Sequence, residues 1–598
     1  MSRALGPRAP LTGSSAAPGW MVLGCIAVPA ALLAVVWAAA KLAAALAGGR
    51  AEGYGFGFCV AVLTARFARA WPGTPTALVA ALTIAAFGLA VAGAVCGWRR
   101  FGEQLFPVPG DPVAALAAHR RQHVTMDLQH TAEKAVQLRA SLYGRNPALV
   151  APADAGQELG DLMRPGRAGP ALYSNWEDTG LAIMGPRSGK TTARAVPLTL
   201  DAPGPVLATS NKSDLWAATR DIRGRRGKVW LFDPCSITWQ RQEFTVDLLE
   251  DVRSAESANR LASHFVLTIE DPSRKDLWGP AAQTLLTCLF LAARLDSRTL
   301  HDVALWLDQP AMPLPASILK EHGFTKFGSS LQGTQNGAPE TRDGIYETAR
   351  TAAKALRDDE VVKWVTPQPG LPAFSPRRFV DSADTLHLLS ESLSYAAPLI
   401  AATTDLVILN GLQRAQQSGG RLDAPLVIIL DEAANICRIA RLPDYYSFLG
   451  SHGILPLTIL QSYEQGQAVW GDSGMAALWG AATCKLIGAG VDSPRLTKDL
   501  SELVGQHDVT VRSIGLGEGR GISENISFRR QALLEAADVR ALRKGTALLL
   551  TSGNRPAIVQ LRNWFSGPRA AEISASIRRA QELITQGALA AVAPGSRP

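Results

Sequence analysis

Two long apolar runs stand out near the start of the chain. Residues 21–40 and 75–98 contain no charged side chain, and each is long enough to cross the ~30 Å hydrocarbon core of a bilayer as a helix. We therefore expect residues 1–100 to form a transmembrane anchor, with spans at about 21–42 and 75–98. A cleaved signal peptide is the alternative for the first run, since residues 45–47 resemble a cleavage site, but the second span favours a retained anchor.

Helical patterns follow the anchor and recur in the middle of the chain. Residues 111–145 predict one helix, which forms most of a stem or linker over 101–165. Residues 278–294 have the length of a helix and a wide apolar face. Residues 343–357 have the same pattern, with Asp343 in the position of an N-cap.

Short apolar segments elsewhere have the length and composition of strands, and most end in polar or acidic residues. They are 181–183, 206–209, 229–232, 426–430 and 454–460. Strands that alternate with helices predict an α/β fold with a parallel sheet, whose ligands bind at the carboxyl ends of the strands. Residues 515–521 are glycine-rich but lack a strand-to-helix context, so we expect a hairpin tip there and no dinucleotide loop.

The first of these strands leads into a candidate phosphate-binding loop. The order strand, Gly-containing loop, Gly189-Lys190-Thr191 and helix is that of a P-loop, whose backbone N–H groups and helix N-terminus hold phosphates. Lys190 would reach the β- and γ-phosphates of ATP, and the Thr191 hydroxyl would hold Mg²⁺. The expected nucleotide-binding residues are Gly185, Pro186, Arg187, Ser188, Gly189, Lys190, Thr191 and Thr192.

The loop departs from the usual pattern at one position. The first glycine of G-x-x-x-x-G-K-[ST] falls on Met184, with Gly185 one place later. Because that glycine serves the turn out of the strand, Gly185 can serve the same turn shifted by one residue.

A second set of candidate residues follows two later strands. Five apolar residues at 426–430 lead to Asp431 and Glu432. Asp431, with Thr191, is placed to hold Mg²⁺ through water, and Glu432 to polarise the water that attacks the γ-phosphate. Gln461 ends the strand at 454–460, where it can touch the γ-phosphate or the attacking water. We therefore expect Glu432, Lys190 and Gln461 to be catalytic.

The charge of the chain is concentrated in its apolar start. The formal net charge is +8, of which +7 lies in residues 1–100, so the remainder is almost neutral. Nucleic-acid binding would therefore need a local patch and no overall field. Residues 220–228 hold five cations in nine positions and are either such a patch or a solvated turn. Seven scattered cysteines without a C-x-x-C pair predict neither a zinc site nor a disulfide framework.

Ordered sequence blocks resemble the conjugative coupling proteins of type IV secretion systems, the TraG/TraD class. The blocks are GPRSGKTT (185–192), ATSNKSDL (208–215), VWLFDP (229–234), SADTLHLL (382–389), LVIILDEAANI (426–436), RLPDYYSFLGSHGILPLTILQSYEQ (441–465), LSELVG (500–505) and the segment 533–565. The resemblance implies a membrane-anchored RecA-like ATPase that uses ATP and Mg²⁺. It also implies a homo-hexamer when active, with a monomer in isolation as an alternative. The implied partners are DNA or a relaxase–DNA complex and the subunits of a secretion channel. The implied location is the cytoplasmic (inner) membrane, crossed twice, with the ATPase body in the cytoplasm.

The resemblance also implies a domain order for the soluble part. The RecA-like nucleotide-binding domain would comprise residues 166–251 and 381–566, with an all-α domain inserted at 252–380. In residues 567–598 we expect a C-terminal helix and then, after about residue 586, a disordered tail.

Three alternative functions stay open. They are a double-strand DNA translocase of the chromosome-partitioning kind, a non-hydrolysing membrane receptor with a degenerate P-loop, and a protein-only secretion ATPase. Many members of the resembled family carry an arginine just before the Gly-Ile of the strand at 454–460, where this chain has Gly450 to Gly453. We expect a substitute arginine, and the candidates are Arg438, Arg441 and Arg495, with His452 as the weaker alternative.

Overall fold

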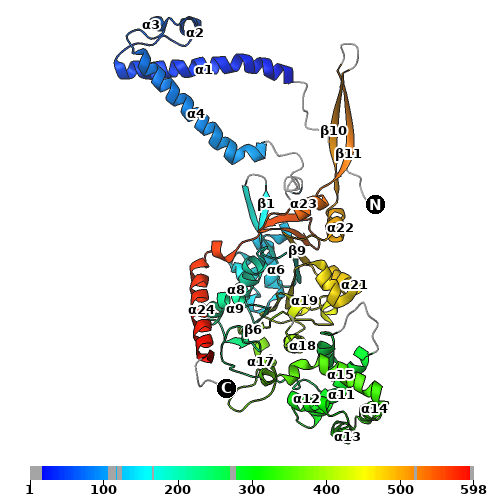
Figure 1. Cartoon of the computed structure of the whole chain (residues 1–598). Helices are drawn as coiled ribbons and strands as arrows, with labels where there is room; N and C mark the ends of the chain where they lie inside the picture. The colour runs from blue at the N-terminus through cyan, green and yellow to red at the C-terminus, as the bar shows by residue number, and fades with distance from the viewer. Residues whose placement is uncertain are drawn as a thin grey trace. The chain divides into compact units, whose positions relative to one another are not determined.

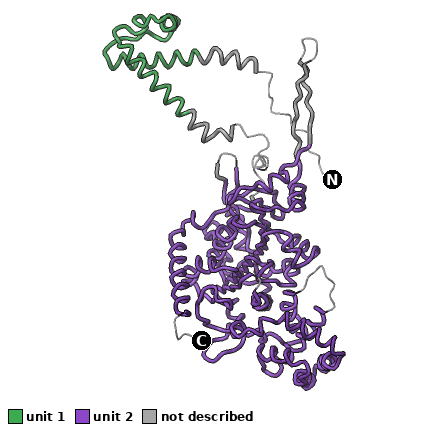
Figure 2. Tube along the Cα trace, in the orientation of Figure 1, with its two compact units in different colours: residues 1–109 green, residues 110–598 purple. Residues whose placement is uncertain are grey.

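The computed structural model describes residues 17–105, 116, 124–164, 167–269, 278–392, 394–516 and 522–592. Two compact units divide the chain, residues 1–109 and residues 110–598 (Figure 2). Each unit is considered by itself below.

The N-terminal unit is helical. Its long helices are α1 (Ala17–Ala47) and α4 (Thr76–Leu105), and the short helices α2 (Phe56–Leu63) and α3 (Phe67–Ala70) connect them. Within the long helices, Pro29–Ala47 and Thr76–Gly93 are long and apolar enough to span a membrane. Most of the side chains in both stretches are exposed, which is expected of helices that face lipid and not of helices in a soluble core.

An eleven-stranded sheet forms the centre of the second unit, counted over the described residues. Its strand order is β2-β1-β13-β12-β9-β3-β8-β7-β4-β6-β5. The bounds are β1 (Gln157–Arg164), β2 (Arg167–Ser174), β3 (Gly180–Ile183), β4 (Val206–Ser210), β5 (Val229–Phe232), β6 (Thr385–Leu389), β7 (Leu426–Leu430), β8 (Ile454–Leu460), β9 (Cys484–Gly488), β12 (Thr546–Thr551) and β13 (Ala557–Gln560).

The α/β fold class is confirmed, but the sheet is not parallel throughout. All neighbouring pairs from β9 to β5 are parallel. From β12 outward to β2 the pairs are antiparallel. The physical reason is the connections: β1–β2 and β12–β13 are joined by turns too short for a parallel crossover.

Apolar side chains cover both faces of the sheet. Alternate residues of β7 enter different clusters, with Ile428 and Leu430 in one and Val427 and Ile429 in the other, as the period of two in a strand requires. The first face is covered by helices that include α18 (Ala397–Gln417) and α21 (Tyr463–Ala481), and the second by α8 (Val196–Asp201) and α9 (Asp214–Arg223). A strand buried on both faces is apolar along its whole length, as the sequence of β7 is.

Helices fill the chain between β5 and β6 and gather at one end of this unit (Figure 1). They are α10 (Ala255–Val266), α11 (Trp278–Leu295), α12 (Leu300–Asp308), α13 (Leu314–Glu321), α14 (Thr325–Gln335), α15 (Pro339–Ala352), α16 (Asp359–Val362) and α17 (Pro376–Val380). Asp343 is not an N-cap, because α15 begins four residues earlier with Pro339 at its first position, where a missing N–H costs nothing.

Two further expectations about helices are wrong. The described part of 111–145 is not one helix: α6 spans only Leu128–Leu138 and begins where the Asp127 side chain accepts a hydrogen bond from the His130 N–H. Residues 587–592 are not a disordered tail but the last part of α24 (Ala570–Val592). That helix packs against α9, and Ser576 Oγ donates to the Ala217 carbonyl at 2.7 Å.

The chain between β9 and β12 forms a separate two-stranded antiparallel ribbon. Strands β10 (Gln506–Leu516) and β11 (Ile522–Ala532) pair in antiparallel register from Gln506–Ala532 to Leu516–Ile522. The expected hairpin is therefore present, while residues 517–521 of its tip lie outside the described residues.

Candidate nucleotide site at the carboxyl edge of the sheet

The phosphate-binding loop joins β3, the middle strand of the eleven-stranded sheet, to a helix. The helix begins as a single π-type turn, Thr191–Ala195, and continues as α8. Gly189 has φ +94, a conformation that favours glycine. Ser188 is buried and its Oγ donates to the Gly185 carbonyl at 2.7 Å, while Pro186 and Arg187 are exposed on the loop.

The unusual Met184 is explained by the strand beside it. A Cβ on Gly185 would lie 2.5 Å from the carbonyl oxygen of Gly490, so this position has no room for a side chain. Met184 is fully buried, and its Cγ would lie 2.7 Å from a Cβ on Gly488. Gly185 is thus the glycine that allows the loop backbone to pass close to the backbone of Gly490. Gly488 has no side chain, and this leaves room for the side chain of Met184.

The carboxylates at the end of β7 lie directly against the P-loop. Thr191 Oγ1 donates to Asp431 Oδ2 at 2.9 Å, and Lys190 forms an ion pair with Glu432. Gln461 Nε2 donates to both carboxylate oxygens of Glu432, at 2.8 Å each. The five expected residues with polar side chains in the catalytic and metal roles therefore meet in one place.

The backbone turns sharply at the second acid. Glu432 has φ +58 and ψ +38, a left-handed conformation that is uncommon for a residue with a side chain and is typical of functional turns. This turn starts the short helix α19 (Ala433–Ile436) and lets Asn435 Nδ2 donate to Glu432 Oε2 at 2.9 Å.

The two acids have opposite electrostatic environments. Burial raises the pKa of Asp431 and outweighs the opposing effects of Lys190 and the Thr191 hydroxyl. Burial also acts to raise the pKa of Glu432, but the hydrogen bonds from Lys190 and Gln461 outweigh it, so this pKa lies below its usual range. Glu432 is therefore held as a carboxylate.

The donor set at the loop fits a magnesium ion. Asp431 Oδ1 is buried and has no hydrogen-bond partner among the described residues, an arrangement that carries a free-energy cost unless another group is bound. Thr191 Oγ1 lies beside the same carboxylate. A hydroxyl and a carboxylate are hard oxygen ligands that suit Mg²⁺.

Two residues of the site were not predicted from the sequence. Asn435 contacts Glu432 as described, and Asn563 Oδ1 accepts a hydrogen bond from Thr192 Oγ1 at 2.8 Å. Asn435 lies within the block 426–436 and could have been found by its spacing of three from Glu432. Asn563 is far from the P-loop in the chain, and no local pattern signals its contact.

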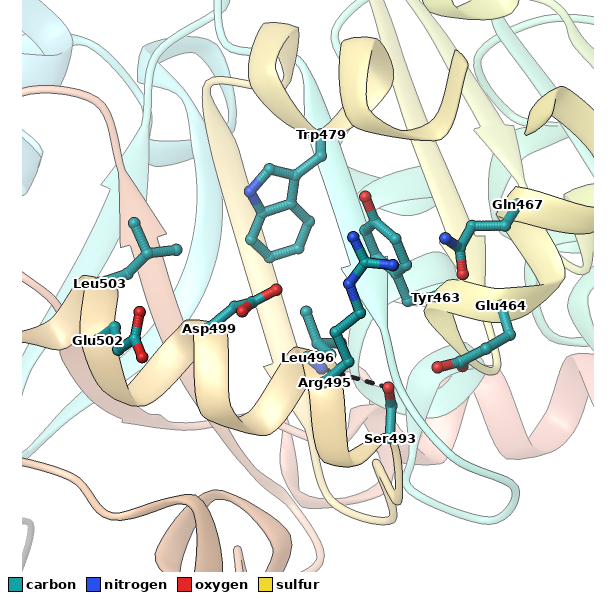
Figure 3. A pocket seen from close by; sticks show the side chains of 10 residues that line it. All are labelled: Tyr463, Glu464, Gln467, Trp479, Ser493, Arg495, Leu496, Asp499, Glu502 and Leu503. Atoms are coloured by element: carbon teal, nitrogen blue, oxygen red, sulfur yellow. Dashed lines mark hydrogen bonds between the residues drawn. The ribbon is translucent and has the colours of Figure 1, made fainter. Parts of the chain in front are cut away.

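The candidate arginines lie in different surroundings. Arg441 is exposed, and Arg438 is half-buried, with its Nε donating to the Ala434 carbonyl at 2.8 Å. Arg495 lies near the start of α22 (Pro494–Val504), in a cavity of about 440 Å³ beside Tyr463 and Trp479 (Figure 3). None of the P-loop residues 185–192 lines that cavity, so Arg495 lies away from the P-loop of its own chain.

The basic segment 220–228 is used within the fold. Arg223 is buried and donates to backbone carbonyls, and burial lowers its pKa to about 10. Arg225 forms an ion pair with Glu572 of α24. The other cations contact neighbouring groups: Arg220 lies over the Trp216 ring, Arg226 donates to the Ala202 carbonyl and Lys228 lies 3.5 Å from the centre of the Trp230 ring. These contacts favour the structural alternative for this segment over a DNA-backbone patch.

Comparison with known proteins gives a match in the region that holds the two acids and Gln461. Residues 425–544 match the family model described as the TraM recognition site of TraD and TraG. A curated relative, the type IV secretion system-coupling protein VirD4 of Bartonella quintana, is 24% identical over 390 residues. The chain is similar to type IV secretion coupling proteins.

The relatives that match cover more than half of this chain. The match to VirD4 covers 61% of this chain and 60% of the length of that relative. A solved structure of the bacterial conjugative coupling protein TrwBdeltaN70 is 17% identical, covers 64% of this chain and 85% of that chain, and has a TM-score of 0.49. A solved structure of the plasmid coupling protein TrwB in complex with ADP and Mg²⁺ is likewise 17% identical, covers 65% and 85% of the two chains, and has a TM-score of 0.48.

Proposed function

We propose that this protein is a membrane-anchored ATPase that couples ATP hydrolysis to the recruitment and transfer of DNA or nucleoprotein through a type IV secretion system. The observation that carries the proposal is the meeting of Lys190, Thr191, Asp431, Glu432 and Gln461 at one edge of the sheet. Similarity to coupling proteins supplies the transfer role. The two apolar helices support anchoring in the cytoplasmic (inner) membrane, with the ATPase body in the cytoplasm, where ATP is found.

The P-loop residues would hold the phosphates of ATP. The backbone of residues 185–192 and the first turn of the helix supply N–H groups for the phosphate oxygens. Lys190 would exchange its ion pair with Glu432 for the β- and γ-phosphates. This exchange releases the Glu432 carboxylate only when nucleotide is present.

Glu432 and Gln461 would then act on the attacking water. Glu432 is held as a carboxylate, so it can accept a hydrogen bond from water and polarise it toward the γ-phosphate. Gln461 donates to Glu432 in the structure and would orient the same carboxylate or the water. Asp431 and Thr191 would hold Mg²⁺, which supplies charge stabilisation for the phosphoryl transfer.

The assembly and the partners follow from the same proposal. RecA-like motors commonly complete each site with a cation from the next subunit, so a homo-hexamer would be the active form and an arginine of one chain would serve its neighbour. The partners would be DNA or a relaxase–DNA complex and subunits of the secretion channel.

The deciding experiment is the ATPase rate of the full-length protein in detergent or lipid nanodiscs, with and without single-stranded DNA. We expect Mg²⁺-dependent hydrolysis that single-stranded DNA accelerates. Nucleotide binding without hydrolysis would instead indicate the non-hydrolysing receptor. Acceleration by double-stranded DNA alone would indicate a translocase of the chromosome-partitioning kind.

A further inference from the structure

A second cavity lies beside the turn that carries Glu432. It measures about 280 Å³ and is bounded on one side by the helical region, at Thr268 and Lys354. On the other side lie Tyr395, which follows β6, and Asn435 and Arg438, which follow β7. The cavity is therefore at the carboxyl edge of the parallel strands, where ligands of α/β sheets bind.

The charged side chains among the described residues that line this cavity are both positive. They are Lys354 and Arg438, and none of these described lining residues is a carboxylate. Arg438 is half-buried, and no carboxylate among the described residues forms an ion pair with it. Burial of the guanidinium lowers the pKa of Arg438. A partly buried cation without a counter-charge costs free energy, and an anionic ligand would relieve that cost.

An aromatic ring stands next to the cations. Lys354 Nζ donates to the Tyr395 hydroxyl at 2.6 Å and lies 3.8 Å from the centre of its ring. Tyr395 is 50% exposed, so part of the ring remains open to a ligand. Cations beside an exposed aromatic ring are the combination that proteins use for single-stranded nucleic acids, with phosphates on the cations and a base on the ring.

The cavity is connected to the catalytic carboxylate through one side chain. Asn435 lines the cavity and donates to Glu432 Oε2 at 2.9 Å. Arg438 donates to the carbonyl of Ala434, in the same short helix as Asn435. Arg438 and Asn435 are therefore both hydrogen-bonded to the segment that carries Glu432.

We infer that this cavity binds a phosphodiester group of single-stranded DNA, and that Asn435 transmits its occupancy to Glu432. The inference rests on the proposed ATPase function and adds to it a site and a route of activation. Lys354 and Arg438 contact the phosphate, Tyr395 stacks on a base, and Asn435 is a positioning residue for the carboxylate.

The binding half of the inference is tested with a fluorescent oligo-thymidine strand and full-length protein, by anisotropy at several salt concentrations. We expect Lys354→Gln and Arg438→Gln each to weaken binding by about tenfold, the size of a lost charged contact. Each should also reduce the slope of log affinity against log salt by about 0.7. The matched control is Lys326→Gln, an exposed lysine of α14 outside the cavity, which should change neither value.

The coupling half is tested with Asn435→Ala. This variant should bind the strand with wild-type affinity but lose the acceleration of hydrolysis by DNA. Its kcat in the presence of the strand should fall to the DNA-free value while its KM for ATP stays unchanged, because Asn435 contacts Glu432. A purely structural loss would instead weaken strand binding and raise the KM for ATP together with the fall in kcat.

Three results would overturn the inference. If the wild-type protein binds the strand and is accelerated by it while the cavity variants behave like Lys326→Gln, the DNA site is elsewhere and the proposed ATPase function stands. If poly-glutamate displaces the strand as well as unlabelled oligo-thymidine does, the cavity binds acidic peptides. If the wild-type protein hydrolyses no ATP and binds no strand, the proposed function fails as well.

Discussion

At the residue scale, the site depends on contacts between side chains that are far apart in the chain. Lys190 and Glu432 form an ion pair, and Thr191 and Asp431 a hydrogen bond. Strand ends and residue types sufficed to predict that these residues meet, because parallel strands bring their carboxyl ends to one edge, but which side chains pair is known only from the structure. The pairing of Thr192 with Asn563 could not be predicted, since it depends on how the antiparallel strands fold back beside the P-loop.

Substitution of the two central residues separates binding from hydrolysis. Lys190→Ala should abolish nucleotide binding or turnover, because it removes the positive charge that faces the phosphates. Glu432→Gln should keep ATP bound while it lowers the hydrolysis rate by about 10²–10⁴-fold, the usual contribution of a general base. Nucleotide binding is measured by fluorescence with a labelled ATP analogue, and turnover by phosphate release. Wild-type turnover by Glu432→Gln would show that another group activates the water.

Restoration of the usual P-loop pattern at Met184 should harm the protein. Met184→Gly removes a fully buried side chain and leaves a cavity over Gly488, which should lower the free energy of unfolding by about 2–5 kcal/mol. The control Met184→Leu keeps the volume and should cost less than about 1.5 kcal/mol. Urea denaturation followed by tryptophan fluorescence gives both values. A more stable or more active Met184→Gly protein would contradict the explanation given for this position.

At the element scale, periodic patterns predicted which segments are strands and helices better than where they end. The apolar runs at 206–209, 229–232 and 426–430 became β4, β5 and β7 with bounds within one residue. The helix expected over 111–145 was wrong because the Asp127 side chain starts a new helix inside it. Strand β1 escaped notice because its polar residues and Gly160 interrupt any apolar run. A strand of this composition is recognised only from its two neighbours, β2 and β13.

Helix α24 should be a required element. Its Ile573 and Ala580 are buried, and its Arg579 forms an ion pair with Asp221 of α9. A chain that ends at residue 569 should melt at a temperature lower by several degrees, because about 2–5 kcal/mol of burial is lost. A chain that ends at residue 592 is the control and should melt like the full chain. Thermal melting by circular dichroism makes the comparison, and equal melting temperatures would show that α24 adds no stability.

At the scale of the whole molecule, most of the net positive charge and the candidate nucleotide site lie in different units. Residues 1–100 carry +7 of the +8 net charge, whereas the described P-loop and both acids lie in residues 110–598. The near-neutral second unit offers no general attraction for a polyanion. Any DNA contact it makes must come from specific cations such as Lys354 and Arg438.

A fragment without residues 1–100 tests this separation. It should be soluble, monomeric and nearly inactive, and should bind DNA weakly at physiological salt. Its ATPase rate per subunit should rise with protein concentration, because a neighbour supplies the missing arginine, which contributes about 10³–10⁵ in rate in related systems.

Mixing Lys190→Ala with variants of Arg438, Arg441 or Arg495 should restore activity for the arginine that serves the neighbour. A high rate that is independent of concentration would contradict a shared site, and nanomolar DNA affinity would reveal a further large basic surface.

The helical region between β5 and β6 has a consequence for how such a chain can change over time. These two strands are parallel neighbours at the end of the sheet, so the chain between them needs only to cross the sheet once. Everything beyond that single crossing can lengthen, shrink or be replaced without a change of strand register. The position of α10–α17 thus lets this one region diversify by exchange of a whole module, while the strands that carry the candidate nucleotide site keep their order and register.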